Sequence, residues 1–199
     1  MFKKCLMAAA AILSLGMMVQ GAEEENLLKG ADFEVFKGKY IPGFLRINAK
    51  HHKFFEQDTK VFHGGKASLR ISNVFPDYVS FSQLKLNVAD FKHPIKITGW
   101  VKYENLVAQQ DGKRCYMPFI GLWGSTASGR NSCNVGIPDI KPGSRDWFKF
   151  EKVFTPEEFA AAAAKVSAKD KPAYLMFRIN IYNQPGTIWV DDLQLTEVE

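Results

Sequence analysis

The sequence predicts an all-β fold, a sandwich of two packed sheets that carries one short surface helix. After residue 22 the chain is a series of short runs rich in β-branched and aromatic residues, separated by Gly, Pro, Asn and Asp. Many short strands at this spacing are typical of a sandwich or barrel rather than an α/β fold. Only one segment has helix signals, and the sequence contains no internal repeat and no interdomain linker.

Residues 1–22 have the pattern of a signal peptide, and residues 23–199 are predicted to form one domain. Lys3 and Lys4 precede an apolar run from Leu6 to Val19, and small residues follow up to Ala22. This run is too short for a stable membrane span, and no later run approaches the roughly 20 apolar residues that a span needs. We therefore expect a soluble bacterial protein that is secreted or periplasmic, with no membrane span.

Eight runs are expected to be strands because they alternate apolar with polar residues or are continuously apolar. Within residues 78–88 the alternation changes phase between Phe81 and Leu84, which predicts a β-bulge. The eight runs are Phe44–Ala49, Ala67–Asn73, Tyr78–Val88, Ile95–Tyr103, Tyr116–Trp123, Phe148–Phe154, Tyr174–Tyr182 and Thr187–Leu195.

The single helix is predicted to begin after Thr155. Thr155 is a favourable N-cap, Pro156 suits the first helical position, and Glu158 is placed for a capping box. An alanine run follows, and the helix is expected to end between Lys169 and Pro172. We interpret it as a surface connection between two strands.

Charge and cysteines give weaker indications. The formal charge falls from +5 to +3 when Lys3 and Lys4 leave with the signal peptide, and no basic block remains, so nucleic-acid binding is not supported. Cys115 and Cys133 are then the remaining cysteines. In an oxidising compartment this pair favours a disulfide, and two buried free thiols are the alternative.

The last predicted strand carries an acid in an unexpected place. With a period of two, Asp191 lies on the same side as Trp189, Leu193 and Leu195. An ionised carboxylate on an apolar face is costly unless a positive or hydrogen-bonding partner meets it. A bound cation is the natural candidate.

Four segments together resemble the family 4, 9 and 22 carbohydrate-binding modules: Asn26–Glu34, Gly64–Ile71, Ile97–Lys102 and Trp189–Leu195. The resemblance implies a β-jelly roll of the galactose-binding-domain type that binds a glycan as a monomer. It also implies a structural calcium held by the side chains of Glu34 and Asp191, with backbone carbonyls near Asp32 and Lys66 completing the shell.

No catalytic constellation is recognisable. A glycosidase needs two carboxylates at a controlled separation, and none of the acid clusters, Glu23–Glu25, Glu157–Glu158 or Asp191–Asp192, has the pattern of such a pair. There is no Gly-x-Ser-x-Gly motif. We therefore expect a protein that is not an enzyme and has no catalytic residues.

A sugar site requires aromatic rings beside planar polar groups, and one strand separates these by parity. In the run 174–182 one side is apolar, whereas the other carries Arg178, Asn180 and Tyr182. Trp123, at a strand end, is the main candidate for a stacking platform, and Trp100 is a second. An ordinary solvent-facing strand is the alternative, and Trp147 and Trp189 are interpreted as structural.

The sequence thus favours calcium-stabilised, non-catalytic carbohydrate binding, in association with a separate enzyme or surface complex. Two alternatives remain. The first is a structural or protein-interaction jelly roll without a sugar site, and the second is a small sandwich-fold polysaccharide lyase or hydrolase.

Overall fold

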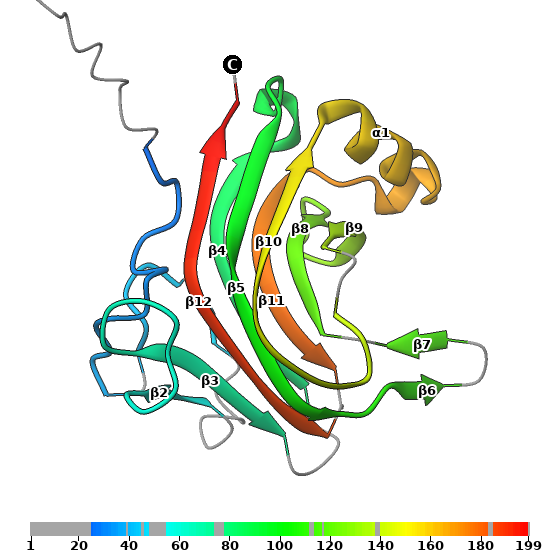
Figure 1. Ribbon diagram of the computed structural model, residues 1–199. Coiled ribbons are helices and arrows are strands. Elements are labelled where there is room, and N and C mark those ends of the chain that lie inside the picture. The colour runs from blue at the N-terminus through cyan, green and yellow to red at the C-terminus, as the bar shows by residue number, and fades with distance from the viewer. Residues whose placement is uncertain are drawn as a thin grey trace, which may run out of the picture.

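The computed structural model shows an all-β sandwich, which confirms the predicted fold class (Figure 1). It describes residues 25–38, 40–44, 46–47, 55–73, 78–111, 114–116, 118–137, 140–182 and 185–198. The predicted signal peptide lies outside these residues. No helix among them is long and apolar enough to cross a membrane.

Two five-stranded antiparallel sheets pack face to face, and we name each after a central strand. The β11 sheet has the order β1-β4-β11-β8-β9, with β1 Arg46–Ile47, β4 Tyr78–Asn87, β11 Tyr174–Tyr182, β8 Phe119–Ser125 and β9 Asn131–Gly136. The β12 sheet has the order β10-β5-β12-β3-β2, with β10 Gly143–Phe154, β5 Ile95–Leu106, β12 Gly186–Glu197, β3 Ser68–Asn73 and β2 Phe55–Asp58. A separate hairpin joins β6 (Gln109–Asp111) to β7 (Arg114–Tyr116).

Alternation builds the core between the two sheets. In β5 the buried positions recur at every second residue from Ile95 to Tyr103, and in β11 they run from Leu175 to Ile181. Core side chains pack tightly against Gly99 in the middle of β5. A methyl group added at Gly99 would lie only 2.5 Å from Leu193 Cδ2. The predicted phase change in β4 is also confirmed, since Leu84 has φ +62° and the β4–β11 register shifts beside it.

A bulge in β12 overturns the predicted parity of that strand. Asp192 adopts φ +49°, and the register with β5 shifts between Asp191 and Gln194. Leu193 and Leu195 therefore belong to the core, whereas Asp191 lies with Trp189 on the outer face of the β12 sheet. Asp191 is nevertheless completely buried. An ionised carboxylate at this position therefore still requires a positive or hydrogen-bonding partner.

The helix begins as predicted and ends early. Helix α1 spans Pro156–Ala164, and the Thr155 side chain accepts a hydrogen bond from the Glu158 backbone N–H at 3.1 Å. The predicted end between residues 169 and 172 is wrong because Ser167 turns the chain into an extended conformation. The short 3-10 helix η3 (Ala168–Asp170) follows, and Lys171 Nζ donates to the Ala163 carbonyl. A second 3-10 turn, η2, spans Val88–Asp90.

The N-terminal segment runs beside the last strand (Figure 1). β3 pairs with β12 only over residues 186–190, and the segment after Asn26 takes over beyond that point. Leu27 N–H donates to the Leu195 carbonyl at 2.8 Å, and Leu193 N–H donates to the Ala31 carbonyl at 3.0 Å. The two ends of the described chain are therefore held together by backbone hydrogen bonds.

Candidate functional site

Pairing across the β11 sheet brings the predicted sugar-binding residues together on its outer face. Arg178 pairs with Ser82 on β4 and with Gly121 on β8, and Asn180 lies next along β11 on the same side. Trp123 is two residues beyond Gly121 on β8, on the same side as Arg178. The structure thus assembles Trp123, Arg178 and Asn180 on one face.

Aromatic contacts organise this face. The Arg178 guanidinium carbon lies 5.1 Å from the centroid of the Trp123 ring, and Phe119 meets Trp123 edge-on at 5.3 Å. A guanidinium over an indole is held by the ring's quadrupole, which fixes both groups. Phe119 was missed from the sequence, although it shares the parity of Trp123 on the same strand.

The polar side chains of this face are not freely solvated. Arg178 is 7% and Asn180 2% exposed, so the alternative of an ordinary solvent-facing strand does not describe them. Trp123 and Phe119 are half-buried and present more of the accessible surface. The Trp123 indole N–H is buried and has no hydrogen-bond partner within the described part of the chain.

Tyr182 and Trp100 stand apart from this cluster. Tyr182 pairs with Tyr78 at the end of β11, and its side chain lies outside the described residues. The prediction that Trp100 shares the site is wrong, because Trp100 is on the outer face of the β12 sheet, with the core between it and Trp123. There the ring of His63 stacks on it at 3.6 Å, and Trp147 meets His63 edge-on at 5.9 Å.

The two acids proposed as calcium ligands face one loop, residues 59–67. Asp191 Oδ2 accepts hydrogen bonds from the backbone N–H groups of His63 at 2.8 Å and Gly64 at 3.2 Å. Glu34 Oε1 accepts from the N–H groups of Lys66 at 2.8 Å and Ala67 at 3.2 Å. The loop therefore connects the N-terminal segment to the bulge of β12.

Two glycines of the loop leave room for carboxylates, Gly64 for that of Asp192 and Gly65 for that of Glu34. A methyl group at Gly64 would lie 2.5 Å from Asp192 Oδ2, and one at Gly65 would lie 2.1 Å from Glu34 Oε1. Gly65 also has φ +59°, which residues with a Cβ rarely adopt. The Gly-Gly pair is the sequence signal for this close approach.

Burial dominates the electrostatics of this loop. Desolvation raises the pKa of Asp191 to about 6, the neighbouring charge of Asp192 adds to the rise, and the backbone N–H groups of His63 and Gly64 oppose it. A cation beside Asp191 would favour its ionised form, and carboxylate oxygens are the ligands that calcium prefers. Asp32 contributes to the geometry, since its carboxylate accepts from the Glu34 N–H at 3.3 Å. The described residues contain no group of three or more His, Cys, Asp or Glu side chains that could hold a metal, so backbone carbonyls would have to complete the shell.

The predicted disulfide is not formed. Cys133 is a free, buried thiol that packs where Gly124 leaves room, and a methyl group there would lie 3.0 Å from both Cys133 Sγ and Phe159 Cζ. Desolvation raises the pKa of this thiol. Cys115 is on the β6–β7 hairpin, outside both sheets, and its side chain lies outside the described residues.

Comparison with solved structures identifies the fold. The xylan-binding CBM22-1 domain of Paenibacillus barcinonensis Xyn10C aligns with a TM-score of 0.50 and 13% identity, over 90% of this chain and 98% of that one. The chain has the jelly-roll fold of carbohydrate-binding modules.

The fold also occurs inside larger, catalytic proteins. The enzymatically active domain of tailspike protein 4 from bacteriophage CBA120 aligns with a TM-score of 0.53 and 10% identity, over 87% of this chain. The chain spans only 21% of that protein. No protein-family model matches the sequence, and no curated protein matches it. At these identities the likeness concerns the fold of the module.

Proposed function

We propose that the protein binds a glycan without catalysis on the outer face of the β11 sheet. The observation that carries this proposal is the contact of Arg178 with Trp123, beside Phe119 and Asn180. Sugar rings pack their C–H faces on aromatic rings, and their hydroxyl groups bond to planar donors such as guanidinium and amide groups. Because Arg178 and Asn180 are buried beneath this surface, they are preorganised rather than mobile.

The composition of the sheet supports binding rather than hydrolysis. The five strands of the β11 sheet contain no Asp or Glu residue. Hydrolysis of a glycosidic bond normally requires two carboxylates that flank it. A glycan lying across these strands would therefore meet hydrogen-bonding groups and aromatic rings but no acid and base pair on the strands.

We further propose that calcium binds between Glu34 and Asp191, with backbone carbonyls near Asp32 and Lys66. Support comes from the two carboxylates that face one loop and from the unfavourable burial of Asp191 in the absence of a cation. The ion would be structural, since it would join the N-terminal segment, the loop and β12. An exported protein meets calcium outside the cytoplasm, which agrees with the signal peptide that the sequence predicts.

The first prediction concerns the glycan site. A glycan array identifies a ligand of the mature protein, and calorimetry then compares wild type with Trp123→Ala. Loss of one aromatic platform should weaken binding by on the order of 1 to 3 kcal/mol, because stacking area and the support of Arg178 disappear together. Tyr182→Ala tests the neighbouring position in the same way.

Trp100→Ala is the matched control, since it removes the same side chain from the opposite sheet. It should leave glycan affinity unchanged in samples whose folding is verified by melting. Equal affinity of wild type and Trp123→Ala would contradict the proposed site. Absence of binding to every glycan on the array would instead favour an interaction module without a sugar site.

A further inference from the structure

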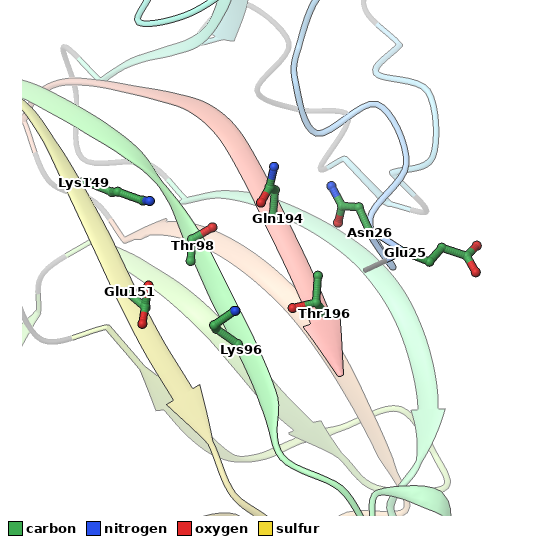
Figure 2. Close-up of a pocket in the computed structure, with 8 residues that line it drawn as sticks. All are labelled: Glu25, Asn26, Lys96, Thr98, Lys149, Glu151, Gln194 and Thr196. Carbon is green, nitrogen blue, oxygen red and sulfur yellow. The ribbon is translucent and has the colours of Figure 1, made fainter. Parts of the chain in front are cut away.

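A polar groove lies on the outer face of the β12 sheet (Figure 2). The proposed glycan site lies on the other sheet of the sandwich. The volume of the groove is about 740 Å³. Strands β10, β5 and β12 form its floor, and the start of the N-terminal segment forms one wall. The residues used below are Lys96, Thr98, Lys149, Glu151, Gln194 and Thr196.

Strand register arranges these side chains in rows. Glu151 on β10, Thr98 on β5 and Gln194 on β12 form one row, and Lys96 pairs with Thr196 in the next. Figure 2 shows Thr98, Gln194 and Thr196 with their oxygen atoms directed over the space between β5 and β12, while the Lys149 ammonium group reaches in from β10. The rows from Lys149 to Lys96 span four residues of strand, about 13 Å, which is longer than a single sugar unit.

Thr196 offers this surface an unused hydrogen-bonding group. The residue is only 6% exposed, and its Oγ1 is buried with no hydrogen-bond partner within the described part of the chain. A buried hydroxyl without a partner costs free energy that a valine of the same shape would avoid. A hydrogen bond from a bound molecule would recover that cost.

The charges in the groove indicate the kind of ligand. None of the lining residues is aromatic, so a neutral pyranose would have no ring to stack on. Lys149 is exposed and makes no ion pair with any described residue. Glu25, in the wall formed by the N-terminal segment, directs its carboxylate away from the strands. Glu151 limits the negative charge that the groove accepts.

We propose that this groove is a second binding site, for a short anionic saccharide whose charge is a carboxylate or a sulfate. Lys149 would bind the anionic group, and the hydroxyl groups of Thr98 and Thr196 with the Gln194 amide would bind the sugar hydroxyls. The site does not depend on the proposed function, because it uses no residue of the β11 sheet.

Calorimetry on the full mature protein tests the proposal with three probes of equal length: tri-galacturonate, a sulfated neutral trisaccharide and the unmodified neutral trisaccharide. All measurements use the Trp123→Ala background, so that any binding at the β11 sheet is weakened. Tri-galacturonate or the sulfated sugar should bind, and the neutral sugar should bind at least tenfold more weakly. Whichever acidic sugar binds identifies the source of the charge. Failure of both acidic sugars would overturn the proposal and leave the glycan site on the β11 sheet unaffected.

Variants place the bound sugar in the groove. Lys149→Gln should weaken binding about five- to tenfold, since it removes one charge-assisted contact. Thr196→Val should weaken binding severalfold while the melting temperature stays unchanged or rises, because the hydroxyl has no hydrogen-bond partner among the described residues. Glu151→Gln should strengthen binding, because a repulsive carboxylate is lost.

Lys165→Gln, at an exposed position after α1, is the charge-matched control. It should leave affinity unchanged. A loss as large as that of Lys149→Gln would mean attraction to the overall positive charge and would overturn the proposal. Unchanged affinity in both Lys149→Gln and Thr196→Val would do the same.

Discussion

Asp191 is a single residue at which burial, charge and backbone geometry oppose one another. Three backbone N–H groups, those of His63, Gly64 and Asp192, donate to its carboxylate. Desolvation still outweighs these bonds and raises the pKa to about 6. The proposed calcium ion would offset the cost of desolvation that these three hydrogen bonds leave.

The pH dependence of stability follows from this shift. Because the folded pKa of Asp191 exceeds its ordinary value of 3.8, the group stabilises the fold fully below that value and loses this contribution as the pH rises through about 6. Between pH 4.5 and 7.5 the loss is about 2 kcal/mol in the absence of metal. Urea unfolding in chelator measures this loss. The stability of Asp191→Asn relative to wild type should rise by about 2 kcal/mol between pH 4.5 and pH 7.5, because asparagine does not titrate.

With calcium present at pH 7.5, the wild type should become more stable than Asp191→Asn, because the asparagine amide lacks the ionised oxygen that binds the ion. Chelator should lower the melting temperature of the wild type and barely change that of the variant. If the free energies of unfolding of the two proteins in chelator changed equally with pH, Asp191 would not titrate as described. An unaltered wild-type melting temperature in chelator would count against the metal.

Gly65 provides a second prediction at the residue scale. Gly65→Ala forces a Cβ into left-handed backbone and displaces the Glu34 carboxylate from the N–H groups of Lys66 and Ala67. Gly38→Ala is the matched control, because Gly38 has φ +65° but nothing within 4 Å of the added atom. Gly38→Ala should lower the free energy of unfolding by about 1 kcal/mol. Gly65→Ala should lower it by roughly 1 to 3 kcal/mol more. Equal losses of unfolding free energy would mean that the Glu34 contacts contribute nothing.

At the scale of the element, helix α1 follows local rules at one end only. Its start was predictable because Thr155, Pro156 and Glu158 act within one turn. Its end depends on Ser167, which bonds to Asp170 through its hydroxyl, and on Lys171, which reaches back to the Ala163 carbonyl. Helix propensity does not predict these contacts, because the alanine-rich sequence favours continuing the helix.

Thr155→Ala should lower the free energy of unfolding by about 1 kcal/mol, because the Glu158 N–H loses its partner. Thr155→Ser retains the hydroxyl and should be nearly neutral. Urea unfolding of the two variants measures the difference. If serine were as destabilising as alanine, the loss would come from the methyl group and not from the cap.

Strands were predictable where alternation is strong and not where it is weak. The runs in β4, β5, β11 and β12 were recognised from their apolar period. Strand β9, Asn-Ser-Cys-Asn-Val-Gly, has no such period, and neither it nor β2 was expected. An edge strand is held by hydrogen bonds to its neighbour, so its sequence needs little apolar character.

At the scale of the whole molecule, Asn26 connects the two ends of the described chain. Its Oδ1 accepts from the N–H groups of Leu28 at 3.0 Å and Leu195 at 2.9 Å, and its Nδ2 donates to the Leu193 carbonyl at 2.9 Å. Asn26→Ala leaves partly buried groups of β12 unpaired and should lower the free energy of unfolding by roughly 1 to 3 kcal/mol.

Asn134→Ala, at an exposed position on β9, is the control for loss of the same side chain and should change stability by less than about 0.5 kcal/mol. Thermal and urea unfolding check both variants. Equal stability of the two would show that the N-terminal segment docks without the help of Asn26.

The sequence by itself determined the fold class, the central strands and the side of β11 on which Arg178 and Asn180 lie. These follow from a period of two and from turn residues, which are local properties. Tertiary structure decided which sheet each strand joins, and parity cannot reveal this. It therefore separated Trp100 from Trp123, placed the Cys133 thiol in the core beneath α1, and paired Lys96 with Thr196 across the groove. It also decided the bulge at Asp192, because a positive φ at a residue other than glycine is imposed by packing around it and leaves no mark in the pattern of apolar residues.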